Sequence, residues 1–155
     1  MIVISDTSPL NHLILIECVH VLPELYGRVV IPAGVFEELQ RQSTPDVVRQ
    51  WMSARPDWLE VRETAVQPDA ALELLGVGER QAICLAEELK AAAIIIDEER
   101  GRKEAKRRGL STIGTLSVLR DAAERELVDL PTAIERLRRT NFRVSDQIID
   151  SLLRK

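Results

Sequence analysis

Two short runs of β-branched residues constrain the fold of this chain more than any other feature. Ile94-Ile95-Ile96 is one such run, and Ile2-Val3-Ile4-Ser5 is a similar run at the start. Apolar residues on both faces of a strand are typical of a parallel sheet covered by helices on each side. An aspartate follows each run directly, Asp97 in the first case and Asp6 in the second. Because parallel strands end at the same edge of their sheet, we expect both carboxylates at that edge, where open α/β sheets bind their ligands.

Strands and helices alternate along the rest of the chain. Further strands are predicted at residues 28–31, 58–62 and 110–113. Apolar residues at helical spacing predict helices at 10–18, 19–26 with an interruption near Pro23, 32–39, 45–54, 78–89, from after Asp97 to 108, 116–124, 131–139 and 145–153, and one or two helical turns at 70–75. Such alternation implies a parallel sheet with right-handed crossovers. The predicted fold class is therefore α/β, a three-layer α/β/α sandwich.

Length and composition exclude several classes of protein. The chain of 155 residues is most simply a single domain, 1–155, and its 45% apolar and 30% charged residues exclude a disordered chain. The longest apolar stretch, at 13–16, is too short to cross a bilayer, and no export signal precedes the first strand. Cys18 and Cys84 lie in apolar helical surroundings without metal-ligand spacing, which favours buried free thiols and a cytoplasmic location.

A run of basic residues follows Asp97. Residues 100–108 read RGRKEAKRR, with six basic side chains in nine, although the net charge of the chain is −4. A local positive patch on an acidic protein is compatible with contact to a nucleic-acid backbone. The alternative is that acids at the start of a helix and bases at its end complement the helix dipole. Both interpretations are compatible with the sequence.

Acidic side chains near the predicted sheet edge indicate a metal site. Asp6 and Asp97 would repel each other without a cation, and Mg²⁺ or Mn²⁺ suits a set of oxygen ligands. Glu79 begins the helix before the isoleucine strand and follows two glycines that allow a close approach. In the helix that starts at residue 32, we choose Glu38 at the edge of the buried face, because Glu37 has a basic residue four positions on. The alternative for each acid is a helix cap or a favourable charge at a helix start.

These acids stand in segments that resemble a known family. Asp6 in IVISDTSPL, Glu38 in IPAGVFEEL, Glu79 in GVGERQAICLAEEL and Asp97 in IIIDEERGRKEAKRRGL are similar to the acidic quartet of PIN-domain nucleases. The similarity is closest to a branch of short prokaryotic PIN-like proteins, which shares the GxGE helix and the IGTLSVL turn at 113–119. It extends over nearly the whole chain, including the late segment NFRVSDQIIDSLL. Many family members carry Asp where this chain has Glu79, but Glu is usual in this branch.

The resemblance implies a PIN fold with a mostly parallel sheet of about five strands. It also implies a metal-dependent endoribonuclease that hydrolyses RNA phosphodiester bonds, often as the toxin of a VapBC-like toxin–antitoxin pair. The four acids are then both catalytic residues and metal ligands, which hold one or two Mg²⁺ or Mn²⁺ ions that activate a water. The expected partners are RNA, a small antitoxin protein and a second copy of the chain in a homodimer, and no membrane.

Six further residues are candidates for contact with the substrate. Three basic residues after Asp97 could neutralise phosphates, which would make binding salt-dependent. Three hydroxyl residues after strands could orient a water or the scissile phosphate, with helix capping as the alternative. The six are Arg100, Arg102, Lys103, Thr7, Ser8 and Thr115.

Two other classes of function are alternatives. A non-catalytic PIN-like module that binds nucleic acid or protein would keep the fold without the chemistry, which the four retained acids disfavour. A Mg²⁺-dependent phosphotransfer protein also uses acids at strand ends. However, Ser8 stands where a haloacid-dehalogenase-like phosphatase needs its second acid, and the late lysine of a receiver domain is not visible. Metal binding by the isolated protein would separate a nuclease from a non-catalytic module.

Overall fold

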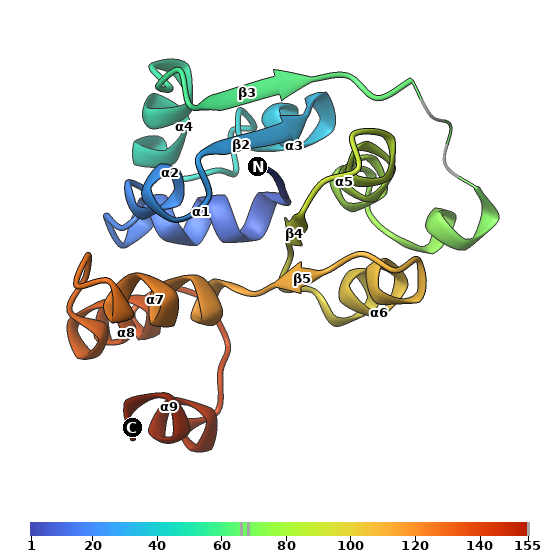
Figure 1. Cartoon of the computed structure of the whole chain (residues 1–155). Coiled ribbons are helices and arrows are strands. Elements are labelled where there is room, and N and C mark those ends of the chain that lie inside the picture. The colour runs from blue at the N-terminus through green and yellow to red at the C-terminus, as the bar shows by residue number, and fades with distance from the viewer. Residues whose placement is uncertain (66, 68, 155) are drawn as a thin grey trace.

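A five-stranded parallel sheet lies at the centre of the molecule, as seen in a computed structural model that describes residues 1–65, 67 and 69–154. Every pair of neighbouring strands is parallel, and Ser5 lies opposite Ile95 where β1 and β4 end. This arrangement confirms the predicted α/β class. The strands, in the order β3-β2-β1-β4-β5 across the sheet (Figure 1), are β1 (Ile2–Ser5), β2 (Arg28–Pro32), β3 (Leu59–Arg62), β4 (Ala93–Ile95) and β5 (Thr112–Ile113).

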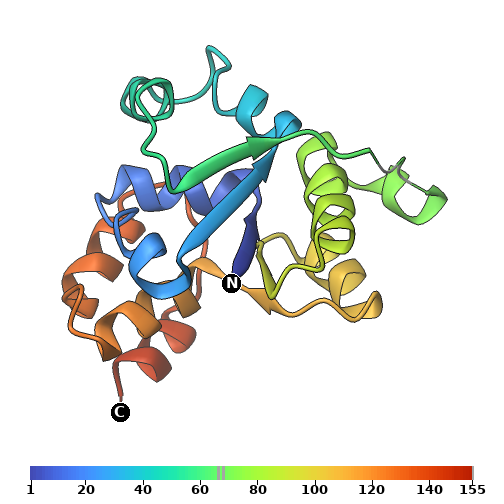
Figure 2. The same cartoon turned by 45° about the horizontal axis from the view of Figure 1, so that its top comes forward.

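Helices cover both faces of the sheet, which gives the predicted three layers (Figure 2). Helices α5 and α6 lie on one face, and α1, α2, α7 and α8 lie on the other. The helices are α1 (Thr7–Leu15), α2 (Val21–Tyr26), α3 (Ala33–Glu38), α4 (Asp46–Ser53), the 3₁₀ helix η1 (Ala70–Leu74), α5 (Val77–Glu88), α6 (Glu99–Arg107), α7 (Thr115–Glu124), α8 (Leu130–Arg138) and α9 (Asp146–Leu153).

Alternate residues of the inner strands pack into two apolar cores. Val3 of β1 lies in the core under α1, α2, α7 and α8, whereas its neighbour Ile4 lies in the core under α5. Ile95 and Ile94 of β4 divide in the same way. All four side chains are buried. The two strands therefore need apolar residues at every position, which is why the sequence marks them so clearly.

Two helices differ from their predicted form. Pro23 does not interrupt its helix, because it lies in the first turn of α2, where its missing N–H has no partner to lose. The first helix begins at Thr7 instead of residue 10, since Pro9 fits within its first turn. That helix also ends early, at Leu15, because Glu17 adopts a φ of 61° that no continuing helix allows.

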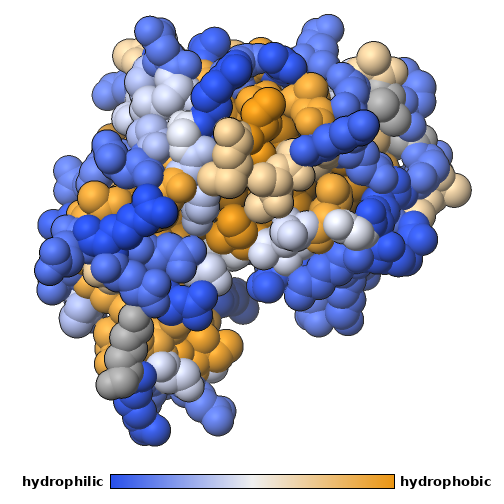
Figure 3. Space-filling model, viewed as in Figure 1, coloured by the Kyte–Doolittle hydropathy of each residue, from blue (hydrophilic) through white to orange (hydrophobic). Residues whose placement is uncertain are grey.

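The C-terminal helix α9 is a surface element with an apolar side. Ile149 is buried, whereas Ile148 is 50% exposed and Leu153 is also exposed. Apolar side chains accordingly gather around this helix in the lower left of the space-filling view (Figure 3). In the described part of the chain, no helix is long and apolar enough to cross a membrane.

The chain reverses direction across the sheet between β1 and β4. From β1 it moves outward to β2 and β3, and it then returns to the other side of β1 to form β4 and β5. Such a switch point leaves a crevice outside the C-terminal ends of the two strands. Asp6 and Asp97 follow these two strands, so the fold brings both to the crevice.

Candidate metal centre

The end of β1 carries a buried carboxylate. Asp6 is 5% exposed, and its backbone N–H donates to the carbonyl oxygen of Ile95 in β4 at 2.9 Å. It is the N-cap residue of α1, yet its side chain makes no capping hydrogen bond with the helix beyond the adjacent Thr7 amide. Helix capping is therefore a poor explanation for an acid at this position.

Asp97, at the other side of the crevice, is held by a residue from a distant part of the chain. Its Oδ1 accepts a hydrogen bond from the Thr115 backbone N–H at 2.8 Å, and its Oδ2 accepts one from Thr115 Oγ1 at 2.6 Å. Thr115 is fully buried at the start of α7. Thr115, a predicted substrate contact, lines neither hollow described below and instead positions Asp97 from behind. Gly114 permits the contact, since a Cβ there would lie 3.3 Å from Asp97 Oδ1.

Glu38 ties the end of α3 to the start of α5. Its Oε1 accepts a hydrogen bond from the Gly78 backbone N–H at 3.1 Å. A Cβ at Gly78 would lie 2.5 Å from the same oxygen, so this contact requires glycine. The neighbouring Glu37 is exposed and does not line the site. The choice of Glu38 over Glu37 therefore agrees with the placement of the two side chains.

Glu79 stands in the first turn of α5, with one carboxylate oxygen engaged and the other free. Oε1 accepts a hydrogen bond from the Gly76 backbone N–H at 3.2 Å. Oε2 is buried and has no hydrogen-bond partner among the described residues. Burial raises the pKa of Glu79, the Gly76 amide opposes this effect, and the charges of Glu98 and Glu38 raise the pKa further.

Three of the four acids raise the pKa of the fourth, Asp6. Burial raises the pKa of Asp6 from 3.8 to about 7, and a hydrogen bond from the Thr7 backbone opposes the rise. The negative charges of Glu79, Glu38 and Asp97 each raise the pKa of Asp6 as well. A divalent cation among these oxygens would lower the pKa of Asp6 and so oppose the effect of its three acidic neighbours.

The acids line two adjoining hollows beyond the C-terminal ends of the strands. Asp6, Glu38 and Glu79 line one of about 770 Å³, which we call the acid hollow. Asp97 lines one of about 730 Å³, which we call the apolar hollow because residues of α7, α9 and the segment before α9 form its apolar wall. The two hollows meet along a ridge of four shared residues, Ser8, His12, Glu98 and Asn141.

The structure divides the predicted substrate contacts. Thr7 and Ser8 line the acid hollow, where Thr7 Oγ1 is buried without a hydrogen-bond partner among the described residues. Arg102 lines the apolar hollow beside Asp97. Arg100 and Lys103, in contrast, line a separate hollow of about 450 Å³ next to η1. Arg102 is thus the member of the predicted basic group that lies with the acids.

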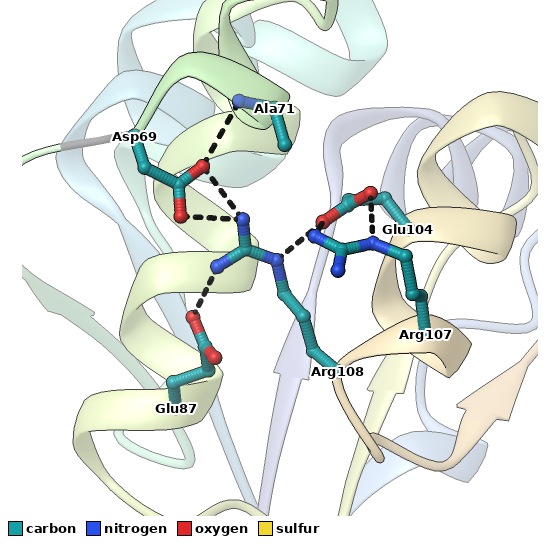
Figure 4. A network of polar contacts seen from close by, with 6 residues as sticks. All are labelled: Asp69, Ala71, Glu87, Glu104, Arg107 and Arg108. Carbon is teal, nitrogen blue, oxygen red and sulfur yellow. Dashed lines mark hydrogen bonds and ion pairs between the residues drawn. The ribbon is translucent and has the colours of Figure 1, made fainter.

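The end of the basic run is neutralised inside the protein (Figure 4). Arg108 binds Asp69 through one guanidinium nitrogen at 2.7 and 2.8 Å, Glu87 at 2.9 Å and Glu104 at 2.6 Å. Arg107 also pairs with Glu104. Arg108 thus joins the end of α6 to α5 and η1, whereas the pair of Arg107 and Glu104 lies within α6. Both arginines are engaged by acids, so neither offers a free phosphate contact.

Three residues of the ridge were not predicted from the sequence. Glu98 directly follows Asp97, and that adjacency is the signal that could have identified it. His12 lies with Nδ1 2.9 Å from the Ser8 carbonyl oxygen and Nε2 2.9 Å from Asn141 Oδ1. His12 and Asn141 are 129 positions apart in the chain, and no local sequence pattern links them.

The chemistry of the site fits a hard divalent cation. As the side chains stand, no group of three or more His, Cys, Asp or Glu residues in residues 1–65, 67 and 69–154 is arranged to hold a metal ion. The available donors are nevertheless carboxylate oxygens, which Mg²⁺ and Mn²⁺ prefer. The unpaired Oε2 of Glu79 and the burial of Asp6 among three other acids both suit a cation.

Comparison with known proteins agrees with this reading of the fold. A family model, DUF3368, described as a PIN domain, matches residues 2–155. The chain belongs to the PIN-domain family. PIN domains are commonly metal-dependent nucleases. The match covers nearly the whole chain, as the resemblance in the sequence predicted.

A solved structure shares the fold of this PIN domain. It is a PilT N-terminus domain protein, SSO1118, from the hyperthermophilic archaeon Sulfolobus solfataricus P2. The two are 17% identical with a TM-score of 0.58, and the match covers 80% of this chain and 95% of the other. None of the curated proteins matches the sequence.

Proposed function

We propose that this PIN domain is a divalent-metal-dependent endoribonuclease that hydrolyses RNA phosphodiester bonds. The observation that carries the proposal is the position of Asp6, which is buried at the switch point of the sheet and feels the charges of Glu38, Glu79 and Asp97. An uncompensated arrangement of this kind destabilises a protein, and proteins keep such arrangements where function needs them.

The four acids divide into two pairs in the proposed site. Asp6 and Asp97, fixed at the two strand ends, would hold one or two Mg²⁺ or Mn²⁺ ions, and Glu38 and Glu79 would complete the site directly or through water. The bound metal supplies the Lewis acidity for attack of water on the phosphorus. Thr115 keeps Asp97 oriented through its two hydrogen bonds. Thr7 and Ser8 line the acid hollow and would orient a water or the scissile phosphate.

Asp6→Asn tests the nuclease proposal. The variant keeps the shape of the side chain but removes a charge, so we expect loss of Mn²⁺-dependent RNA cleavage by about a hundredfold or more. Glu38→Gln and Glu37→Gln form a matched pair on α3: the first should lose activity and the second should keep it, since Glu37 is exposed outside the site. Equal rates of RNA cleavage by wild type and Asp6→Asn would contradict the nuclease proposal.

Calorimetry separates the nuclease from the non-catalytic module. Wild-type protein that has been stripped of metal should take up Mn²⁺, and Asp6→Asn should bind it at least about tenfold more weakly. A folded wild-type protein that takes up no Mn²⁺ would favour a module that binds nucleic acid or protein without cutting it.

The resemblance to VapBC-like toxins leads us to propose a toxin role and two protein partners. The toxin would pair with a small antitoxin and would form a homodimer. Expression of the chain alone should slow growth of a bacterial host, and co-expression with the product of the adjacent gene should restore it. Growth of the Asp6→Asn strain should equal that of an empty-vector strain. Light scattering of the purified protein tests the homodimer.

A further inference from the structure

We propose that the apolar hollow is a nucleoside subsite, which receives an unstacked base of a single-stranded substrate beside the phosphate that is cut. The inference rests on the proposed nuclease function and deepens it. It assigns a role to the segment 141–154, which carries none of the four acids and yet forms one wall of the site.

The lining of the apolar hollow suits a flat ring with polar edges. Phe142, Leu116 and Ile148 contribute apolar surface from the segment before α9, from α7 and from α9. Ser117 and Asn141 place a hydroxyl and an amide in the same hollow. An apolar cavity with a few convergent polar groups is the usual form of a small-molecule site. Aromatic and apolar side chains of this kind stack against exposed nucleic-acid bases.

Two arginines and the acids Asp97, Glu98 and Glu99 accompany this apolar surface. Arg102 and Arg143 both line the apolar hollow, and neither forms an ion pair within the described residues. Arg107 and Arg108, on the other side of α6, are bound to acids. A free guanidinium beside a cavity is well suited to a phosphate group. Charge and apolar surface together indicate a ligand that carries both a planar ring and phosphates.

The shared ridge connects the base to the reaction. Ser8, His12, Glu98 and Asn141 line both hollows, so a ligand in the apolar hollow directly adjoins the acid hollow. His12 is buried and packs edge-on against Phe142, with 5.2 Å between the ring centroids, which fixes the ridge. A base that is paired and stacked in a duplex is unavailable to such a cavity. The occupant is therefore a nucleotide of a single strand.

Two test variants and one control with matched exposure examine the subsite. Ile148→Glu places a negative charge on the wall of the apolar hollow, at a residue that is 50% exposed and so tolerant of change. Val47→Glu is the control, because Val47 is 54% exposed on α4 and lines neither hollow. Ser117→Trp, which fills the hollow without adding charge, is the second test variant.

Binding is measured by calorimetry in buffer with MnCl₂, with the four nucleoside 5′-monophosphates and with ribose 5-phosphate. Because all five ligands carry the same phosphate, their difference isolates the base. We expect at least one monophosphate to bind about tenfold more tightly than ribose 5-phosphate. Ile148→Glu and Ser117→Trp should remove this difference, and Val47→Glu should keep it. In cleavage of a single-stranded oligonucleotide, Ile148→Glu should raise KM about tenfold and leave kcat within about twofold.

Failure of the subsite and failure of the nuclease proposal give different results. Cleavage of RNA by wild type with equal KM in Ile148→Glu and Val47→Glu overturns the subsite and keeps the nuclease. Binding of a monophosphate that depends on Ile148, with no cleavage of RNA, keeps the subsite and overturns the nuclease. If monophosphates bind no more tightly than ribose 5-phosphate and Ile148→Glu instead dissociates a dimer in light scattering, a second copy covers this hollow and the subsite is overturned.

Discussion

Asp6 is the residue in which stability and function most clearly conflict. Burial and three neighbouring acids raise its pKa to about 7, so the metal-free protein keeps a proton there that the unfolded chain releases near pH 4. Between these two pH values the folded state holds more protons than the unfolded state. The free energy of unfolding of the metal-free protein must therefore fall as the pH rises through this window.

Asp6→Asn should make the metal-free protein more stable at pH 8 than wild type. The gain should be on the order of 2–4 kcal/mol, because the amide has no charge to desolvate and no acid neighbours to repel. The difference should shrink as the pH falls toward 4, because Asp6 then becomes protonated in the unfolded state as it already is in the folded state. Urea unfolding in EDTA across pH 4–8 measures the difference. The raised pKa would be contradicted if the free energy of unfolding of wild type instead rose from pH 4 to pH 7 and that rise were absent in Asp6→Asn.

Gly101 is a second residue whose identity the site determines. A Cβ there would lie 2.5 Å from Ile96 Cδ1 and 2.8 Å from the free Oε2 of Glu79. We expect Gly101→Ala to cost about 1–3 kcal/mol of stability through overpacking and to weaken Mn²⁺ binding through Glu79. Thermal unfolding and calorimetry measure the two effects.

Ile96→Val separates the two effects of Gly101→Ala. It removes Cδ1, the closest atom to the new methyl group, but leaves Glu79 in contact with it. In the Ile96→Val background, Gly101→Ala should therefore cost less stability than in wild type and should weaken Mn²⁺ binding by the same factor. Full recovery of Mn²⁺ affinity in the double variant would show that the methyl group acts through the core alone.

At the scale of elements, Arg108 joins three of them. Its guanidinium links the end of α6 to Asp69 at the start of η1, to Glu87 of α5 and to Glu104 of α6 (Figure 4). Its side chain is 11% exposed, whereas that of Arg107 is 62% exposed. Since α5 carries Glu79 and α6 carries Arg102, this network also sets the distance between two walls of the site.

Arg108→Met should destabilise the protein by about 1–2 kcal/mol, because Glu87 loses its partner and Glu104, which keeps Arg107, loses one of two. Arg107→Met should change the free energy of unfolding much less, because Arg107 belongs to an exposed pair. Hydrogen bonds from Arg107 and Arg108 lower the pKa of Glu104 from 4.5 to about 2. That contribution is complete above pH 4.5 and is lost as the pH falls toward 2, so the unfolding curves of wild type and Arg108→Met should converge at acid pH.

Local patterns explain how much of the fold and site could be predicted. The ends of β1 and β4 were predictable, because strands covered on both faces need apolar residues throughout and an acid after such a run is conspicuous. Glu38 could be separated from Glu37 by helical spacing. The hydrogen bonds of Thr115 to Asp97 and of His12 to Asn141 join distant segments, and no periodicity encodes them. For the same reason the sequence left Arg108 open between a phosphate contact and a favourable interaction with the helix dipole, and did not predict its pairing with acids of η1 and α5.

At the scale of the whole molecule, arginines lie around the acids of the site although the net charge is negative. The chain carries a net charge of −4, yet Arg41 and Arg139 line the acid hollow and Arg102 and Arg143 line the apolar hollow. A nucleic acid approaching this edge of the sheet therefore meets guanidinium groups around the acids. Binding through these groups releases counterions from the phosphates, so the affinity must fall steeply with salt.

Arg143→Gln should reduce that salt dependence by one phosphate contact. In fluorescence titrations of Asp6→Asn protein with a single-stranded RNA oligonucleotide, the slope of log K against log [salt] should become less negative by about 0.7. Lys90→Gln is the control, because it removes the same charge far from the site. Lys90 is exposed in the turn that enters β4, at the opposite edge of the sheet. The slope of this control should equal that of the parent protein. If both variants change the slope equally, net charge alone governs RNA binding; if only Arg143→Gln changes it, the RNA backbone passes over the apolar hollow at Arg143.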